Sequence, residues 1–269
     1  MNDDPNSINA LVTGLNGTVA PVFAKHLAMA GHVITPWDRA VVPVDDLPAI
    51  REFIHRTSPD WFFHFAAGSP TWAEMVARVC AEEGVKFLFS SSVSVFSNSQ
   101  HGPFTVDVPP AATDDYGRYK IECERLVRNA NPDAIVARLG WQIGTASGSN
   151  NMVDFLDRTA RTQGYVEASR AWYPACSFLK DTAESMMQLM QSYPAGLYHL
   201  DGNPGLSFFE IAVHLNRLHG NHWAVVSCDS PAQNSRMVDQ YIKVNPITRE
   251  FDRGDSHTTS GPGSPDGET

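Results

Sequence analysis

Three polar side chains occur at spacings that suit proton transfer. Tyr116 and Lys120 are four residues apart in the segment YGRYK, so a helix there would place both on one face. Ser92 closes the run FSSS, directly after an apolar stretch. A phenol with a pKa near 10 is a poor acid–base catalyst at neutral pH, and a neighbouring ammonium favours its ionised form. With the serine hydroxyl on the same substrate oxygen, these groups could protonate a carbonyl while a hydride donor reduces it.

Taken singly, each of these signals is unspecific. A tyrosine and a lysine four residues apart are common on helices, and serine runs are common in loops. Tyr116 could be a partly buried aromatic residue with a hydrogen-bonded hydroxyl, and Lys120 a solvated charge. Their order along the chain, behind a glycine-rich turn, is more specific than either one alone.

That turn is the segment TGLNGTVA, residues 13–20, between a short apolar run and a helical pattern. Gly14 and Gly17 permit a tight turn and a close backbone approach, and Ala20 is small enough for helix–strand packing. The free N–H groups of a helix N-terminus attract a diphosphate. The alternative is a tight turn that binds nothing. We predict that the turn, including Asn16, binds NADP or NAD.

The choice between these two cofactors stays open in the sequence. The second expected strand ends in Trp37-Asp38-Arg39. An acid at this place commonly accepts the ribose 2′-hydroxyl, whereas an arginine can hold a 2′-phosphate. Asp38 and Arg39 stand side by side, and they could also form a solvated ion pair.

The surrounding elements predict an α/β fold, a Rossmann-type doubly wound parallel sheet with a smaller C-terminal substrate-binding lobe. We expect an NAD(P)-binding domain over 1–140, a partly intertwined lobe over 141–250 and a disordered tail over 251–269. The patterns predict strands at 8–12, 32–36, 61–67, 86–90 and 134–140, which alternate with helices at 17–30, 46–56, 71–83 and 116–128. Beyond Gly140, the patterns predict helices at 151–162, 179–192 and 207–218 and a strand at 196–200.

Composition narrows the function classes. The chain has 269 residues and a formal net charge of -10, without the basic stripe typical of nucleic-acid binders. It has no apolar run of the roughly 18–20 residues that span a membrane, and its acidic start does not resemble a secretory signal. Its four cysteines are widely spaced, and no group of residues has metal-ligand spacing. We expect a cytoplasmic protein with a small-molecule partner, no nucleic acid, no membrane and no metal.

Several of these segments together resemble the extended short-chain dehydrogenase/reductase superfamily, and most closely its dTDP-4-dehydrorhamnose reductase-like branch. The resemblance covers about residues 8–245. It implies that Ser92, Tyr116 and Lys120 are catalytic, and that His64, Ala66 and Ala67 line the cofactor. The matching segments are LVTGLNG (11–17), WDRA (37–40), PDWFFHFAA (59–67), FSSSVSVF (89–96), YGRYK (116–120), ARLGW (137–141) and GLYHLDG (196–202).

Three further residues are candidates for the substrate side. Arg138 and Trp141 lie at the end of the fifth expected strand, near where a nucleoside or sugar would stack. Asn151 belongs to a segment similar to the asparagine-containing stretch that opens a helix over the sugar nucleotide in this superfamily. Arg138 could equally form an ion pair at the surface or between the lobes.

The sequence also departs from this branch. Pro43 stands where the branch usually has an acid near the adenine. Only 24 positions separate Ala67 from Ser91, fewer than usual, and the missing stretch normally helps to cover the cofactor. A shortened cover predicts weaker nucleotide binding or an unusual substrate.

The resemblance implies an NAD(P)H-dependent reductase of a nucleotide-activated 4-keto-deoxy-sugar, with Tyr116 as proton donor. One alternative is an epimerase or another sugar-nucleotide-modifying enzyme that uses the same residues. A second is a non-catalytic, nucleotide-binding regulatory subunit on the same fold. By analogy with relatives, a homodimer through helices near 72–84 and 117–129 is one option.

Overall fold

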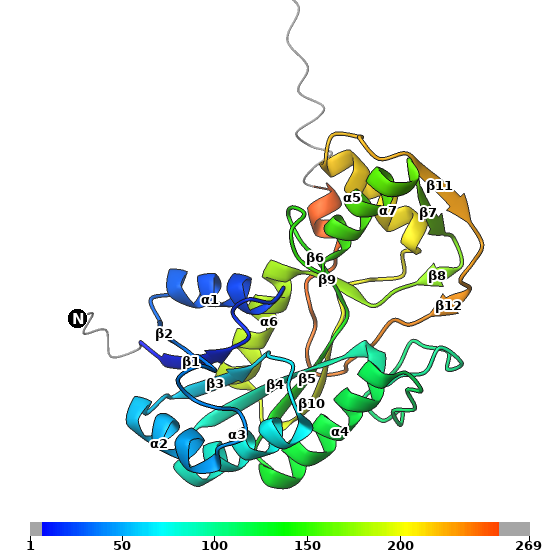
Figure 1. Cartoon of the computed structure of the whole chain (residues 1–269). Coiled ribbons are helices and arrows are strands. Elements are labelled where there is room, and N and C mark those ends of the chain that lie inside the picture. The colour runs from blue at the N-terminus through cyan, green and yellow to red at the C-terminus, as the bar shows by residue number, and fades with distance from the viewer. Residues whose placement is uncertain (1–6, 253–269) are drawn as a thin grey trace, which may run out of the picture.

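The computed structural model describes residues 7–252, and its centre is a six-stranded parallel sheet (Figure 1). The spatial order of the strands is β10-β5-β4-β3-β1-β2. From β1 the chain adds β2 on one side of the sheet, and it then adds β3, β4, β5 and β10 in turn on the other side. Open α/β sheets bind ligands at the carboxyl ends of the strands at such a switch point, here between β1 and β3. The strands are β1 (Asn9–Thr13), β2 (Val33–Pro36), β3 (Trp61–His64), β4 (Lys86–Ser92), β5 (Ile135–Leu139) and β10 (Gly196–Leu200).

Helices cover both faces of this sheet, which explains the continuous apolar runs of its strands. Along β1, Val12 packs into the core under α1 (Ala20–Met29) and α6 (Leu179–Ser192). The preceding Leu11 packs into the opposite core, because successive side chains of a strand point to opposite faces. That second core lies under α2 (Leu47–Thr57), α3 (Pro70–Glu83) and α4 (Asp115–Ala130).

The remaining elements form a second lobe with its own apolar core, above the sheet in Figure 1. Its strands pair in parallel two by two, β6 with β9, β7 with β11 and β8 with β12. The elements are β6 (Trp141–Ile143), α5 (Met152–Gln163), β7 (Val166–Ser169), β8 (Trp172–Tyr173), β9 (Cys176–Phe178), α7 (Phe208–Leu218), β11 (Val225–Cys228) and β12 (Gln233–Asn234).

The two lobes are intertwined more deeply than a boundary at residue 140 implies. The chain leaves the sheet after β5, enters the second lobe through β6, and returns for α6 and β10. Met186 and Met190 of α6 lie in the same core as Phe23 of α1. A helical pattern shows that a segment is amphipathic but not which core receives its apolar face, so residues 179–200 are placed only by the tertiary structure.

Of the expected tail at 251–269, residues 253–269 lie outside the described part of the chain, and Phe251 is buried in the core of the second lobe.

The outward positions of α3 and α4, where a dimer was one option, carry charged side chains such as Arg78 and Arg125, paired within their own helices. No helix within residues 7–252 is long and apolar enough to cross a membrane.

Candidate active site

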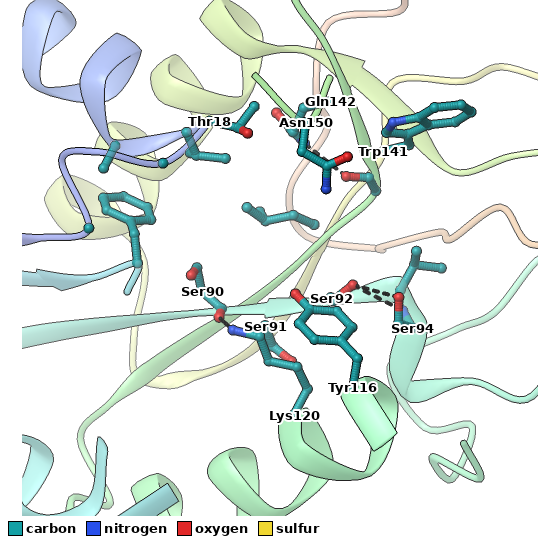
Figure 2. Close-up of a pocket in the computed structure, with 18 residues that line it drawn as sticks. Thr18, Ser90, Ser91, Ser92, Ser94, Tyr116, Lys120, Trp141, Gln142 and Asn150 are labelled. Atoms are coloured by element: carbon teal, nitrogen blue, oxygen red, sulfur yellow. Dashed lines mark hydrogen bonds between the residues drawn. The ribbon is translucent and has the colours of Figure 1, made fainter. Parts of the chain in front are cut away.

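A cleft of about 360 Å³ opens at the carboxyl ends of β1, β4 and β5 (Figure 2). Four parts of the chain line it: the glycine turn before α1, Phe65 after β3, the end of β4 with the start of α4, and the segment from β5 to α5. The cleft therefore gathers residues that are far apart in sequence. Six of the predicted site residues line it: Gly14, Gly17, Ser92, Tyr116, Lys120 and Trp141.

Lys120 is buried at the base of the cleft, with only 4% of its surface exposed. Its Nζ donates a hydrogen bond to the Ser90 carbonyl oxygen at 2.8 Å and lies 4.8 Å from the centre of the Phe89 ring. Burial lowers the pKa of Lys120 to about 8, although Cys123 and Glu124 favour the charged form. The ammonium is therefore close to its titration point at physiological pH.

Tyr116 stands at the mouth of the cleft, half exposed, with its hydroxyl beside Ser92 (Figure 2). Partial burial raises the pKa of the Tyr116 phenol, and a hydrogen bond with the Ser92 side chain opposes this rise. The net shift is thus opposite to the lowering expected from the Lys120 ammonium, because burial is the largest cause. Lys120 Nζ lies 5.9 Å from the centre of the Tyr116 ring.

Close packing at Gly117 brings Tyr116 to this position. A Cβ atom at Gly117 would lie 2.2 Å from the Ser94 carbonyl oxygen and 2.3 Å from the Ala112 Cβ. Only glycine therefore lets the first turn of α4 rest on the chain that follows β4. Asp114 caps this turn, because its carboxylate accepts the Gly117 N–H at 2.8 Å.

The glycine turn fits a diphosphate. Gly14 has φ +80°, and a Cβ there would come within 2.9 Å of the Ala66 nitrogen. No side chain caps the N-terminus of α1, which begins directly beside the cleft at Ala20. Its free N–H groups can thus bind an anion, and the missing Cβ atoms let one approach. The residues present therefore suit a nicotinamide dinucleotide.

Thr13 joins this turn to the end of β3. Its hydroxyl oxygen accepts the N–H groups of Phe65 and Ala66, at 3.0 and 3.1 Å. His64 lies behind the turn, where burial lowers its pKa to about 3, so its ring is neutral. Phe65 lines the cleft instead of His64.

The other residues predicted to bind the cofactor are not among those that line the cleft. Arg39 donates to the Ala67 carbonyl oxygen at 2.5 Å, and its guanidinium lies 4.8 Å from the centre of the Trp72 ring. The carboxylate of Asp38 accepts the Ala40 N–H at 2.9 Å. Asn16 is exposed on the turn.

The structure places two of the three predicted substrate residues outside the cleft. Arg138 is buried, and its guanidinium pairs with Glu124 on α4, because alternation along β5 turns its side chain to that face. Asn151 caps α5 by accepting the Asp154 N–H at 3.0 Å. Trp141 and the neighbouring Asn150 do line the cleft.

Sequence reasoning missed Gln142 in the cleft wall. Its Nε2 donates to the Gly140 carbonyl oxygen at 3.0 Å, and its Oε1 has no partner among the described residues. The only signal for this residue in the sequence was its position next to Trp141, after the fifth expected strand. Residues 7–252 hold no group of three or more metal-ligating side chains.

Two known proteins have sequences related to this chain. The spore coat polysaccharide biosynthesis protein SpsK of Bacillus subtilis (strain 168) is 23% identical over 233 residues, which cover 81% of each chain. The dTDP-4-dehydrorhamnose reductase of Mycolicibacterium smegmatis is 25% identical over 67% of this chain and 59% of that protein.

A solved structure shares the fold along nearly the whole chain. The dTDP-4-dehydrorhamnose reductase of Bacillus anthracis, in complex with NADP, superposes with a TM-score of 0.79 at 16% identity. The match covers 93% of this chain and 99% of that one. The model of the RmlD substrate binding domain matches residues 69–240, well over half of the sequence. The chain therefore belongs to the RmlD substrate-binding-domain family, within the extended short-chain dehydrogenases/reductases.

Proposed function

We propose that this protein is an NADPH-dependent reductase that acts on the keto group of a nucleotide-linked 4-keto-deoxy-sugar. The observation that carries the proposal is the convergence of Ser92, Tyr116 and Lys120 in one cleft with an uncapped, glycine-rich diphosphate turn. Family membership and the NADP held by the Bacillus anthracis structure support the same reading.

The residues of the cleft have distinct roles in this reaction. A bound nicotinamide dinucleotide supplies the hydride. Tyr116 gives its proton to the carbonyl oxygen, and its raised pKa keeps the phenol protonated at neutral pH, the state that a donor requires. Ser92 has one hydroxyl proton, which it donates to the same oxygen in place of its hydrogen bond to Ser94 Oγ. Lys120, positively charged below pH about 8, supplies the adjacent charge that favours the phenolate that remains.

The residues that follow β2 favour NADPH over NADH. The Asp38 carboxylate accepts the Ala40 N–H and still has acceptor sites for a ribose hydroxyl, so the preference rests on Arg39. The Arg39 guanidinium is positioned on the Trp72 ring and keeps free donors for a phosphate. We expect Arg39→Met to weaken NADPH binding by about tenfold or more, the cost of one charged hydrogen-bonding partner. NADH binding should change little, and fluorescence titration of both cofactors measures the difference.

The decisive experiment follows nicotinamide absorbance while the protein is mixed with NADPH and a panel of nucleotide 4-keto-sugars. Turnover by the wild type, with a loss of about 10²–10⁴-fold in Tyr116→Phe and retained NADPH binding, supports the proposal. Tyr165→Phe is the matched control, because this tyrosine lies in the turn after α5 and does not line the cleft.

Two other outcomes would replace the proposal. Conversion of the sugar without net NADPH consumption, detected by chromatography, would identify an epimerase. NADPH binding without turnover of any sugar in the panel would favour a regulatory subunit.

A further inference from the structure

A buried polar network lies behind the cleft, one helical turn beyond Lys120. The Glu124 carboxylate accepts hydrogen bonds from Arg138 Nε at 2.9 Å and Nη2 at 2.7 Å. It also accepts the hydroxyl of Ser91 at 2.5 Å. The side chains of Arg138 and Glu124 are only 2% and 7% exposed. The pair thus lies within the protein, between α4, β4 and β5.

The network continues to the edge strand β10. Arg138 Nη1 lies 3.3 Å from His199 Nε2, and His199 Nδ1 lies 3.1 Å from the Phe104 carbonyl oxygen. A guanidinium can only donate, so Nε2 accepts and Nδ1 carries the proton that it donates to Phe104. Burial and the Arg138 charge lower the pKa of His199 to about 4, which keeps this ring neutral.

This network meets the catalytic groups at Ser91. The preceding residue, Ser90, holds Lys120 through its carbonyl oxygen. The following residue, Ser92, forms the hydrogen bond with Tyr116. Three consecutive residues of β4 therefore contact three residues on one face of α4, and the Ser91–Glu124 contact is the one that involves neither Lys120 nor Tyr116.

A buried ion pair is a weak source of stability, because desolvation offsets much of the attraction. In this protein the Glu124–Arg138 pair instead fixes the position of the Glu124 carboxylate. Two hydrogen bonds from a planar guanidinium fix the Glu124 carboxylate, so the Ser91 hydroxyl can meet it in only one register. A shift of about 1 Å between two elements that carry reacting groups can lower a rate by about 10²-fold.

We propose that Glu124, held by Arg138, is a positioning residue that sets the register of the β4 end against α4 through Ser91. Ser92 and Tyr116 converge on one substrate oxygen because of this contact. The inference rests on the proposed function for the atoms that react, but the geometry it describes can be measured without a substrate.

Ser91→Ala tests this, because it removes the contact and leaves the Glu124–Arg138 pair complete. Tyr116 ionisation is followed by absorbance near 295 nm, as the difference between each variant and the same protein carrying Tyr116→Phe. We expect Ser91→Ala to raise the titration midpoint, since the Ser92 hydrogen bond that lowers the Tyr116 pKa is lost. Turnover should fall at least about tenfold, with NADPH affinity within twofold of wild type.

Two variants separate positioning from folding. Ser91→Thr keeps the hydroxyl and should restore the wild-type midpoint and most of the turnover. Ser185→Ala removes another buried serine hydroxyl, which donates to the Asp181 carbonyl oxygen within α6, and should leave the midpoint unchanged.

The outcomes distinguish this inference from the proposed function. An unchanged Tyr116 midpoint in Ser91→Ala would overturn the inference, whether or not a sugar is turned over. A shift of the same size in Ser185→Ala would also overturn it, because general loosening would then be the cause. A raised midpoint in Ser91→Ala alone, in a protein that reduces no sugar, would support the inference and refute the proposed function.

Discussion

Lys120 and Tyr116 share one face of α4, but burial acts on them in opposite directions. It lowers the pKa of the ammonium to about 8 and raises the pKa of the phenol, because in each case the charged form is penalised. At neutral pH the lysine is charged and the tyrosine is protonated. This is the protonation state required for reduction of a carbonyl.

The Lys120 pKa leads to a pH prediction. The ammonium is charged below pH about 8 and loses its proton above it, so the reduction rate should fall as pH rises through that value. Lys120→Arg keeps a positive charge at all these pH values and should remove this alkaline limb, at a lower maximal rate. Initial rates between pH 6 and about 10 measure the effect. The same limb in the arginine variant would assign it to another group.

At the scale of elements, Gly14 shows how a turn and a neighbouring strand depend on each other. Gly14 and Gly31 both have positive φ, +80° and +83°. An added Cβ meets the Ala66 nitrogen at 2.9 Å in the first case and nothing within 4 Å in the second. A comparison of alanine substitutions at these two positions therefore distinguishes the effect of backbone strain from that of a steric clash.

Both Gly14→Ala and Gly31→Ala should lose about 1–2 kcal/mol of unfolding free energy from the left-handed backbone. Only Gly14→Ala should also push the end of β3 away and weaken NADPH binding. Denaturant titrations and cofactor fluorescence measure the two effects. Equal NADPH affinity in both variants would show that the turn does not contact the cofactor.

Asn151 and Asn150 form a second matched pair, at the start of α5. Asn151→Ala removes the helix cap and should lower the unfolding free energy by about 1 kcal/mol. Asn150 is exposed in the cleft, so Asn150→Ala should leave stability within about 0.5 kcal/mol and raise the KM for the sugar nucleotide. The reverse pattern would contradict the assignment of Asn150 to the cleft and Asn151 to the cap.

At the scale of the whole molecule, the cleft lies between two lobes that the described chain crosses five times, after β5, β9, β10 and β12 and again after Val244. A ligand that contacts both lobes must stabilise the folded chain as a unit. NADPH at about 100 times its Kd should add about 2.7 kcal/mol, which raises the Tm by about 5–10 °C in a chain of this size. Thermal unfolding with NADPH, NADH and no cofactor measures this, and no shift with either cofactor would refute dinucleotide binding.

The sequence by itself determined the main helices, the strands of the central sheet and the nucleotide-binding architecture, but not the short strands of the second lobe. The period of the apolar residues is a local property, so it located the helix at 179–192 and the strand at 196–200 correctly. The pairing of Tyr116 with Lys120 was also predictable, because helical geometry fixes a spacing of four residues. The strand expected to reach residue 67 ends at His64, where Phe65 and Ala66 turn to donate their N–H groups to Thr13.

Only the tertiary structure decided which polar side chains face the cleft. Alternation along β5 sets the face of the sheet to which Arg138 points, but only the tertiary structure places Glu124, fourteen residues earlier on another element, at that face. Asn150 and Asn151 are chemically identical, and the start of α5 assigns one to the cleft and the other to the cap. The Tyr116 pKa likewise depends on burial, which arises only when distant segments pack together.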